Sequence, residues 1–196
     1  HLHYLHRRQR LMCIRDRDFG IKENILRIMK NMGGDITVVP PSTSAKEIEA
    51  LKPDGIFLSN GPGDPKVLTS AVNEVKEMMK LEIPIFGICL GHQIMSLAYD
   101  LKIEKMPFGH HGANHPVHDL KNNTVFITSQ NHNFAVAEVE DRADISITHK
   151  SLFDGSIQGI EHCEKPFYSI QCHPEASPGP KEFEVLFERF FEDMNA

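Results

Sequence analysis

The stretch of sequence that decides the fold is Pro84-Ile85-Phe86-Gly87-Ile88-Cys89-Leu90-Gly91. Residues 84–88 are apolar throughout, which is typical of a central parallel strand covered on both faces. The Gly-x-Cys-x-Gly that overlaps its end has the layout of a nucleophile elbow, in which small residues flank a nucleophile on a tight strand-to-helix turn. We therefore predict an α/β fold with Cys89 at the carboxyl end of a central strand.

The sequence on either side of this stretch alternates between helical and extended patterns. Helices are predicted from residue 21 to Gly33-Gly34, from Ser44 to before Lys52-Pro53, and over 67–80, with strands at 35–39, 55–58 and 84–88. After Tyr99, shorter strand-like segments follow at 124–129, 134–139, 145–148 and 167–171, before a closing helix over 180–194. This order predicts a mostly parallel central sheet flanked by helices, with a strand-rich second half.

Residues 1–17 do not fit this pattern. Arg15-Asp16-Arg17 places charges where a central strand should lead into Asp18-Phe19-Gly20, and a buried parallel strand is expected to be apolar there. The segment is either a frayed edge or not native to the fold, and we favour the second explanation. The predicted domain therefore covers residues 18–196.

Composition and charge exclude several classes of protein. The 196 residues carry a formal net charge of −6, so no basic surface for nucleic acid is expected, and no apolar run approaches the roughly 20 residues of a membrane span. Four cysteines, Cys13, Cys89, Cys163 and Cys172, form no CxxC pair and indicate free thiols in a reducing compartment. Because no secretory signal pattern is present, we expect a soluble, cytoplasmic protein.

Cys89 is the candidate nucleophile. The amide donors and the dipole at the start of the following helix stabilise a thiolate there. A buried structural cysteine is the alternative for a cysteine in an apolar segment, but the elbow favours the reactive one. Cysteine catalysis also requires a base and an oxyanion site, which must come from elsewhere in the chain.

A candidate base is found in His173-Pro174-Glu175, directly after the predicted strand 167–171. The carboxyl ends of parallel strands share one edge of a sheet, so His173 can meet Cys89 although the two are far apart in sequence. Glu175 would then orient the imidazole. Taken alone, this motif also fits a histidine in a surface loop.

A candidate oxyanion site is found in Gly61-Pro62-Gly63-Asp64-Pro65, which follows the predicted strand 55–58. Its glycines allow backbone amides to approach a ligand closely. An ordinary Gly/Pro turn explains the local sequence equally well. The motif matches neither a phosphate-binding loop nor a dinucleotide-binding fingerprint.

Together, residues 59–65, 87–93 and 173–175 resemble the class I, or triad, glutamine amidotransferase family, and the resemblance extends from about residue 18 to the C-terminus. It implies a flavodoxin-like fold with Cys89 as nucleophile, His173 as general base and acid, and Glu175 as its orienting carboxylate. It also places the amides of Gly61, Gly63 and Leu90 near the substrate oxyanion.

Within that family, residues 108–117, 128–136, 151–155 and 174–180 look like the small subunit of carbamoyl-phosphate synthetase, rather than the glutaminases of anthranilate or guanylate synthesis. The resemblance implies that Gln93, Asn131 and Phe134 help to bind L-glutamine. Asn133 stands where the family pattern has glycine. Because asparagine tolerates a left-handed backbone, we expect this loop to survive while Asn133 crowds the glutamine site and weakens binding.

The resemblance further implies hydrolysis of glutamine to glutamate and ammonia without a cofactor in this domain. The ammonia would pass to a carbamoyl-phosphate synthetase large subunit, where ATP and magnesium are used to make carbamoyl phosphate for arginine and pyrimidine synthesis. The family's small subunit carries a further N-terminal domain that this sequence lacks, so we expect a fragment. A glutaminase of another biosynthetic pathway and a non-catalytic regulatory module are the alternatives.

Two other groups of residues are predicted to have no part in this chemistry. His110, His111, His115 and His118 could suggest zinc, but they fall inside the family-like segment, and we expect no metal. Cys172 should point to the strand face opposite that of His173, so we expect it to pack in the core.

Overall fold

The computed structural model describes residues 12–137, 139, 142–176, 179–180 and 182–196. Within these ranges nine strands form one sheet in the order β2-β1-β3-β4-β9-β8-β6-β5-β7. The strands are β1 (Met12–Arg17), β2 (Gly34–Val39), β3 (Gly55–Leu58), β4 (Ile85–Ile88), β5 (Ile103–Asp119), β6 (Thr124–Val136), β7 (Ile145–Ser151), β8 (Ile157–His162) and β9 (Phe167–Ile170). The helices are α1 (Glu23–Asn31), α2 (Ala45–Ala50), α3 (Thr69–Met78), α4 (Leu90–Ala98) and α5 (Val185–Asp193), with short 3₁₀ turns at Pro65–Val67 and Glu182–Glu184.

The predicted α/β class is correct, but the sheet is parallel only in its first half. Strand β1 pairs in parallel with β2 and β3, β3 with β4, and β4 with β9. The remaining strands pair antiparallel, including β8 with β9. The expectation of a mostly parallel sheet is therefore too strong, because short connections join β5 to β6, β7 to β8 and β8 to β9, and each of these pairs is antiparallel.

The antiparallel strands of the sheet form a closed unit. β6 pairs with β5 and β8, and β7 pairs with both β5 and β8, so these four strands form a barrel-like unit. The segments predicted at 124–129 and 134–139 belong in part to one long strand, β6, whose partner β5 was not predicted. The pairing of β5 with β6 shifts register between Lys105 and His110, which marks a bulge.

Strand β1 occupies a position that the charge pattern did not predict. Residues 12–17 form this strand between β2 and β3, inside the sheet rather than at its edge. The hydrogen bonds between these strands are made by backbone groups, so charged residues in the sequence do not prevent the pairing. The sheet therefore begins before residue 18, the predicted domain boundary. The prediction for residues 1–11 lies outside the described residues.

Local sequence explains several element boundaries. The side chain of Ser44 accepts from the amide of Glu47, and Glu47 accepts a hydrogen bond from the amide of Ser44, which completes the predicted capping box of α2. Gly33, at φ +91°, follows the last turn of α1 as the predicted left-handed cap. The predicted helix 67–80 instead begins as a 3₁₀ turn, where Asp64 accepts from the amide of Lys66, and continues as α3.

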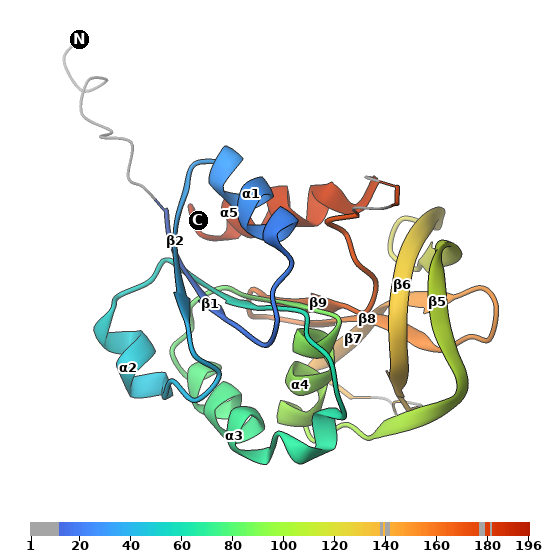
Figure 1. Cartoon of the computed structure of the whole chain (residues 1–196), viewed down its shortest axis with the longest axis horizontal. Coiled ribbons are helices and arrows are strands. Elements are labelled where there is room, and N and C mark those ends of the chain that lie inside the picture. Colours follow the sequence, from blue (N-terminus) through green and yellow to red (C-terminus); the bar gives the residue numbers. More distant parts are fainter. Residues whose placement is uncertain (1–11, 138, 140–141, 177–178, 181) are drawn as a thin grey trace, which may run out of the picture.

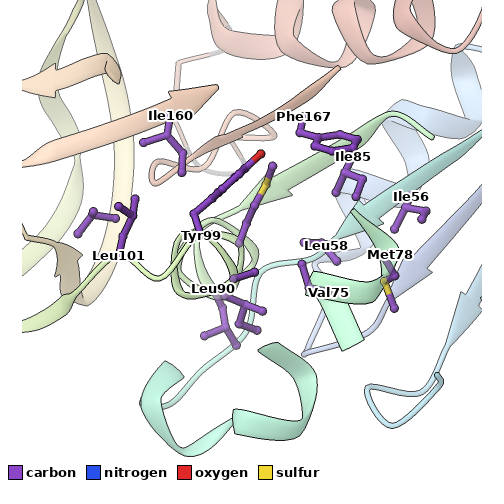
Figure 2. Packing of buried hydrophobic residues seen from close by; sticks show 14 of the residues in the cluster. Ile56, Leu58, Val75, Met78, Ile85, Leu90, Tyr99, Leu101, Ile160 and Phe167 are labelled. Atoms are coloured by element: carbon purple, nitrogen blue, oxygen red, sulfur yellow. The ribbon is translucent and has the colours of Figure 1, made fainter. Parts of the chain in front are cut away.

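Two cores cover the two faces of the parallel half. Helices α2, α3 and α4 pack on one face, where Ile56, Leu58 and Ile85 meet Val75 and Met78 (Figure 2). Helices α1 and α5 pack on the other face (Figure 1), where the partners include Phe57, Phe86, Phe187 and Phe190. Alternate residues of β3 thus enter opposite cores, as expected for a strand covered on both sides. None of the helices in the described ranges is long and apolar enough to cross a membrane.

Candidate active site

Cys89 lies at the turn between β4 and α4, with backbone angles φ +52° and ψ −102°. A left-handed φ is uncommon for a residue other than glycine and indicates a turn held by its surroundings. The amide of Cys89 donates to Ile170 O of β9 at 2.9 Å, and a Cβ at Gly91 would overlap the carbonyl oxygen of Leu58. The glycine therefore lets α4 approach β3 closely, and the predicted elbow is present.

His173 and Glu175 form a buried pair next to this elbow. His173 Nδ1 lies 2.7 Å from Glu175 Oε1, and the two side chains are 4% and 0% exposed. Burial is the largest influence on the pKa of His173 and lowers it, but side-chain hydrogen bonds to Cys89 and Glu175, together with their charges, outweigh burial and raise the pKa to about 9. The structure thus brings Cys89, His173 and Glu175 together, and their catalytic roles stay predictions.

The position of His173 depends on both halves of the sheet. It follows β9, the strand that pairs in parallel with the cysteine strand β4. Its amide donates to Ser129 O of β6 at 2.9 Å. The backbone of His173 is therefore held between the parallel strands and the antiparallel unit.

Glu175 is held by two residues that the sequence analysis missed. Lys22 Nζ lies 3.0 Å from Glu175 Oε1, and Asn24 Nδ2 donates to Glu175 O at 2.6 Å. Burial is the largest influence on the pKa of Glu175 and raises it, but the hydrogen bond and charge of His173 and the ion pair with Lys22 outweigh burial, so the pKa lies below its ordinary value. Nothing in the sequence around Lys22 distinguishes it from a surface lysine, since its role arises only when α1 packs beside the loop after β9.

The predicted oxyanion residues lie on two adjoining segments. The amide of Gly91 donates to Ser59 O at 3.1 Å, which brings the loop after β3 to the start of α4. Among the described residues, the amide of Leu90 has no acceptor, as expected for the first residue of a helix. Gly63 has φ +108° and open space around it, whereas Gly61 packs against the backbone of Phe19. Gly61 therefore fixes the loop to its neighbour, and the role of the Gly61, Gly63 and Leu90 amides as oxyanion donors stays a prediction.

The residues predicted to bind glutamine are arranged around β6. Asn131 O lies 4.0 Å from Cys89 Sγ, which places this part of β6 directly against the nucleophile. Gln93 is buried, and its Nε2 donates to Phe134 O at 2.9 Å and to Gln171 Oε1 at 3.0 Å. Gln93 thus ties α4 to β6 and β9, and Phe134 is half-buried beside it.

The expected left-handed backbone at Asn133 is not found. This residue lies within the extended strand β6 and has no positive φ, so asparagine is not needed there for a left-handed turn. Its Oδ1 lies 3.2 Å from His111 Nε2 on the neighbouring strand. Whether Asn133 weakens glutamine binding stays a prediction.

The histidine-rich part of β5 is a packed cluster. The ring centroids of His110 and His115 are 4.8 Å apart, and those of His110 and His132 are 5.0 Å apart. Burial is the main cause that lowers the pKa of His132, to about 4, and it also lowers the pKa of His115. In the part of the chain that the structure describes, no three His, Cys, Asp or Glu side chains are arranged to hold a metal ion. Cys172 is fully buried in the core cluster to which α1 and α5 contribute, and burial raises its pKa well above the ordinary value.

A cysteine, a histidine and a glutamate aligned at the carboxyl edge of a helix-covered sheet define a triad-type thiol site on an α/β fold. The chain belongs to the class I glutamine amidotransferase family, since the sequence pattern of "Glutamine amidotransferase class-I" matches residues 15–193.

Curated relatives carry a more specific name. The chain is 57% identical to the carbamoyl phosphate synthase small chain of Photorhabdus laumondii over 175 residues, which is 89% of this chain and 45% of the relative. It is 54% identical to that of Haemophilus ducreyi over 179 residues, which is 91% of this chain and 46% of the relative. The chain thus spans about half the length of the curated relatives it matches.

Solved structures support the fold alone. The crystal structure of a GMP synthase protein from Thermoplasma acidophilum superposes with a TM-score of 0.82 over 94% of both chains, at 22% sequence identity. At this identity the likeness says nothing of the substrate. The α/β architecture of the family is nevertheless shared over nearly the whole chain.

Proposed function

We propose that this chain hydrolyses L-glutamine to glutamate and ammonia through a γ-glutamyl thioester on Cys89. The observation that carries this proposal is the continuous relay from Cys89 through His173 to the buried Glu175, built on a strained elbow. Cysteine enzymes need such a nucleophile, base and orienting group in mutual contact. Glutamine is the substrate that membership of the family supports.

In the first step the sulfur of Cys89 attacks the carboxamide carbon of glutamine. His173 takes up the thiol proton and donates it to the departing ammonia, and its raised pKa favours the protonated imidazole that this donation requires. Glu175 keeps Nδ1 engaged, so that Nε2 is presented to the reacting atoms. A glutamyl thioester and ammonia result.

In the second step a water molecule, deprotonated by His173, attacks the thioester and releases glutamate. Both steps pass through a tetrahedral oxyanion, for which the amides of Gly61, Gly63 and Leu90 are the proposed donors. Loss of one such donor typically lowers kcat by ~10²–10³. Each step uses only groups of this chain, glutamine and water, and we propose no cofactor for it.

We further propose that the ammonia is consumed by a carbamoyl-phosphate synthetase large chain, which binds ATP and magnesium, for arginine and pyrimidine synthesis. Two relatives at 54% and 57% identity bear the name carbamoyl phosphate synthase small chain, which supports this acceptor over others. The free thiols of Cys89, Cys163 and Cys172 suit the reducing cytoplasm.

The proposal is tested by glutamate release from glutamine, measured with and without a carbamoyl-phosphate synthetase large chain. The Cys89→Ser variant is the blank. We expect Cys89-dependent release that the large chain increases. Release that only a different synthetase increases would reassign the acceptor, and a folded chain without release would indicate a binding module.

A further inference from the structure

We propose that His111 is a positioning residue of the glutamine site, because it holds the side chain of Asn133 against β5 and so limits how far that side chain crowds bound glutamine. This inference rests on the proposed function. It assigns a role to a contact at the point where the sequence departs from the family pattern.

The contact is a bridge between two strands. His111 of β5 pairs with Asn131 of β6 in the sheet register. Its Nδ1 lies 3.0 Å from Asn131 Oδ1, and its Nε2 lies 3.2 Å from Asn133 Oδ1. Asn131 and Asn133 are two residues apart on one strand, so their side chains share one face, and a single imidazole reaches both.

Both bonds can form whether the ring is charged or neutral. An imidazolium donates from both nitrogens to the two amide oxygens. A neutral ring donates from one nitrogen, and an asparagine turned by half a rotation donates its Nδ2 to the other. The bridge therefore does not depend on one protonation state.

The bulge in β5 makes room for Asn133. Gly109 has φ +67°, and a Cβ there would lie 2.6 Å from both Asn133 Oδ1 and His132 O, and 2.8 Å from His111 Nε2. The asparagine oxygen thus lies against the bare backbone of Gly109 and beside the His111 ring. The side chain of Asn133 therefore lies over β5 and does not extend away from the sheet.

The bridge formed by His111, Asn131 and Asn133 lies close to the nucleophile. Asn131, the first partner of His111, contacts Cys89 Sγ through its backbone oxygen at 4.0 Å. Asn131, Asn133 and His111 are all exposed, so the bridge lies at the open side of the site rather than in the core. Removing His111 should free Asn133 to rotate toward the space that the substrate occupies.

The test is a double-mutant cycle in the full chain, with KM and kcat for glutamine measured for the wild type, His111→Ala, Asn133→Gly and the double variant. We expect His111→Ala to raise KM by about three- to tenfold, the size expected for one lost hydrogen bond, with kcat within about twofold. In the Asn133→Gly background the same change should raise KM by a clearly smaller factor, because the crowding side chain is absent and only the contact with Asn131 is lost.

Two variants control for a general loss of structure. His118→Ala removes a half-buried histidine of β5, whose Nε2 lies 2.9 Å from Asn123 Oδ1, and should leave KM unchanged. His111→Gln retains an amide donor and should restore KM toward the wild-type value. If His111→Ala does not fold, a normal KM for His111→Gln together with a raised KM for His111→Leu supports the inference, and equal KM values overturn it.

A second readout separates this inference from the proposed function. Glutamine should protect Cys89 from alkylation by iodoacetamide, with a protection midpoint that rises in His111→Ala. The inference alone would be overturned if the wild type hydrolyses glutamine and His111→Ala has the same protection midpoint and the same KM as the wild type. Absence of both hydrolysis and protection in the wild type would overturn both.

Discussion

His173 contacts both other members of the relay, and its environment sets its charge. Burial at 4% exposure opposes the protonated form, yet the side chains of Cys89 and Glu175 favour it strongly enough to raise the pKa to about 9. The pKa of His173 is higher in the folded chain than in the unfolded chain. Its protonation must therefore also affect the free energy of unfolding.

We therefore predict that the free energy of unfolding falls as the pH rises from about 6.5 to about 9. The folded-state pKa lies above the unfolded value, so the stabilisation is complete below about pH 6.5 and is lost as the pH passes the folded-state pKa. Urea denaturation across this interval measures it, with His173→Gln as the control. Parallel curves for the two chains would contradict the assignment.

Lys22 is a second residue whose role comes from its contacts. It lies 3.0 Å from the buried Glu175 and is 35% exposed. We predict that Lys22→Met lowers kcat by about tenfold, because a hydrogen bond to a charged group is lost and the His173 ring is less firmly oriented. Lys22→Arg should restore part of the rate, whereas Lys76→Met, which removes the surface pair with Asp100, should leave it unchanged.

At the scale of elements, the sequence predicted those helices and strands whose boundaries are determined by local sequence patterns. Strand β3 (Gly55–Leu58) and the α2 capping box were correct because apolar runs and caps act over a few residues. Strands β1 and β5 were not predicted, since their pairing is made by backbone groups while their sequences carry charges, histidines and glycines. The proximity of Cys89, His173 and Glu175 was predictable from two motifs at one sheet edge, but Lys22 and Asn24 were not, because their contacts are long-range.

The contact between α4 and β3 gives a prediction at this scale. Gly91→Ala would place a Cβ on the carbonyl oxygen of Leu58, so α4 must move and the Cys89 turn with it. We expect glutamine hydrolysis to fall by about 100-fold, as a misplacement near 1 Å can cause, while the far-ultraviolet circular dichroism is retained.

Gly155→Ala is the matched control for this substitution. Gly155 has φ +72° with nothing near its missing Cβ, so the variant carries backbone strain without the clash. It should lose some stability but keep its activity per folded molecule. An active Gly91→Ala chain would show that the close approach is not required.

At the scale of the whole molecule, the C-terminal helix closes the structure over the cysteine strand. Phe187 of α5 is fully buried, with its ring centroid 5.6 Å from that of Phe86 on β4 and 6.3 Å from that of Phe57 on β3. Strand β9 joins the parallel strands to the antiparallel unit in one continuous sheet. The two halves should therefore unfold together.

We predict that Phe187→Ala lowers the free energy of unfolding by about 3–5 kcal/mol, the usual cost of removing a buried aromatic ring. Val185→Ala, on the exposed side of the same helix, should change it by less than about 0.5 kcal/mol. Urea unfolding followed by near- and far-ultraviolet circular dichroism should give coincident transitions for both variants. Separate transitions would indicate that the halves are independent.

The central claim is that Cys89 carries the glutamyl group, and trapping that thioester tests it most directly. The chain is mixed with glutamine, quenched in acid during turnover, and analysed by intact mass and peptide mapping. We predict one added glutamyl group on the peptide that contains Cys89, and neither adduct nor hydrolysis in Cys89→Ser. Continued hydrolysis by Cys89→Ser, or an adduct on another residue, would contradict the account.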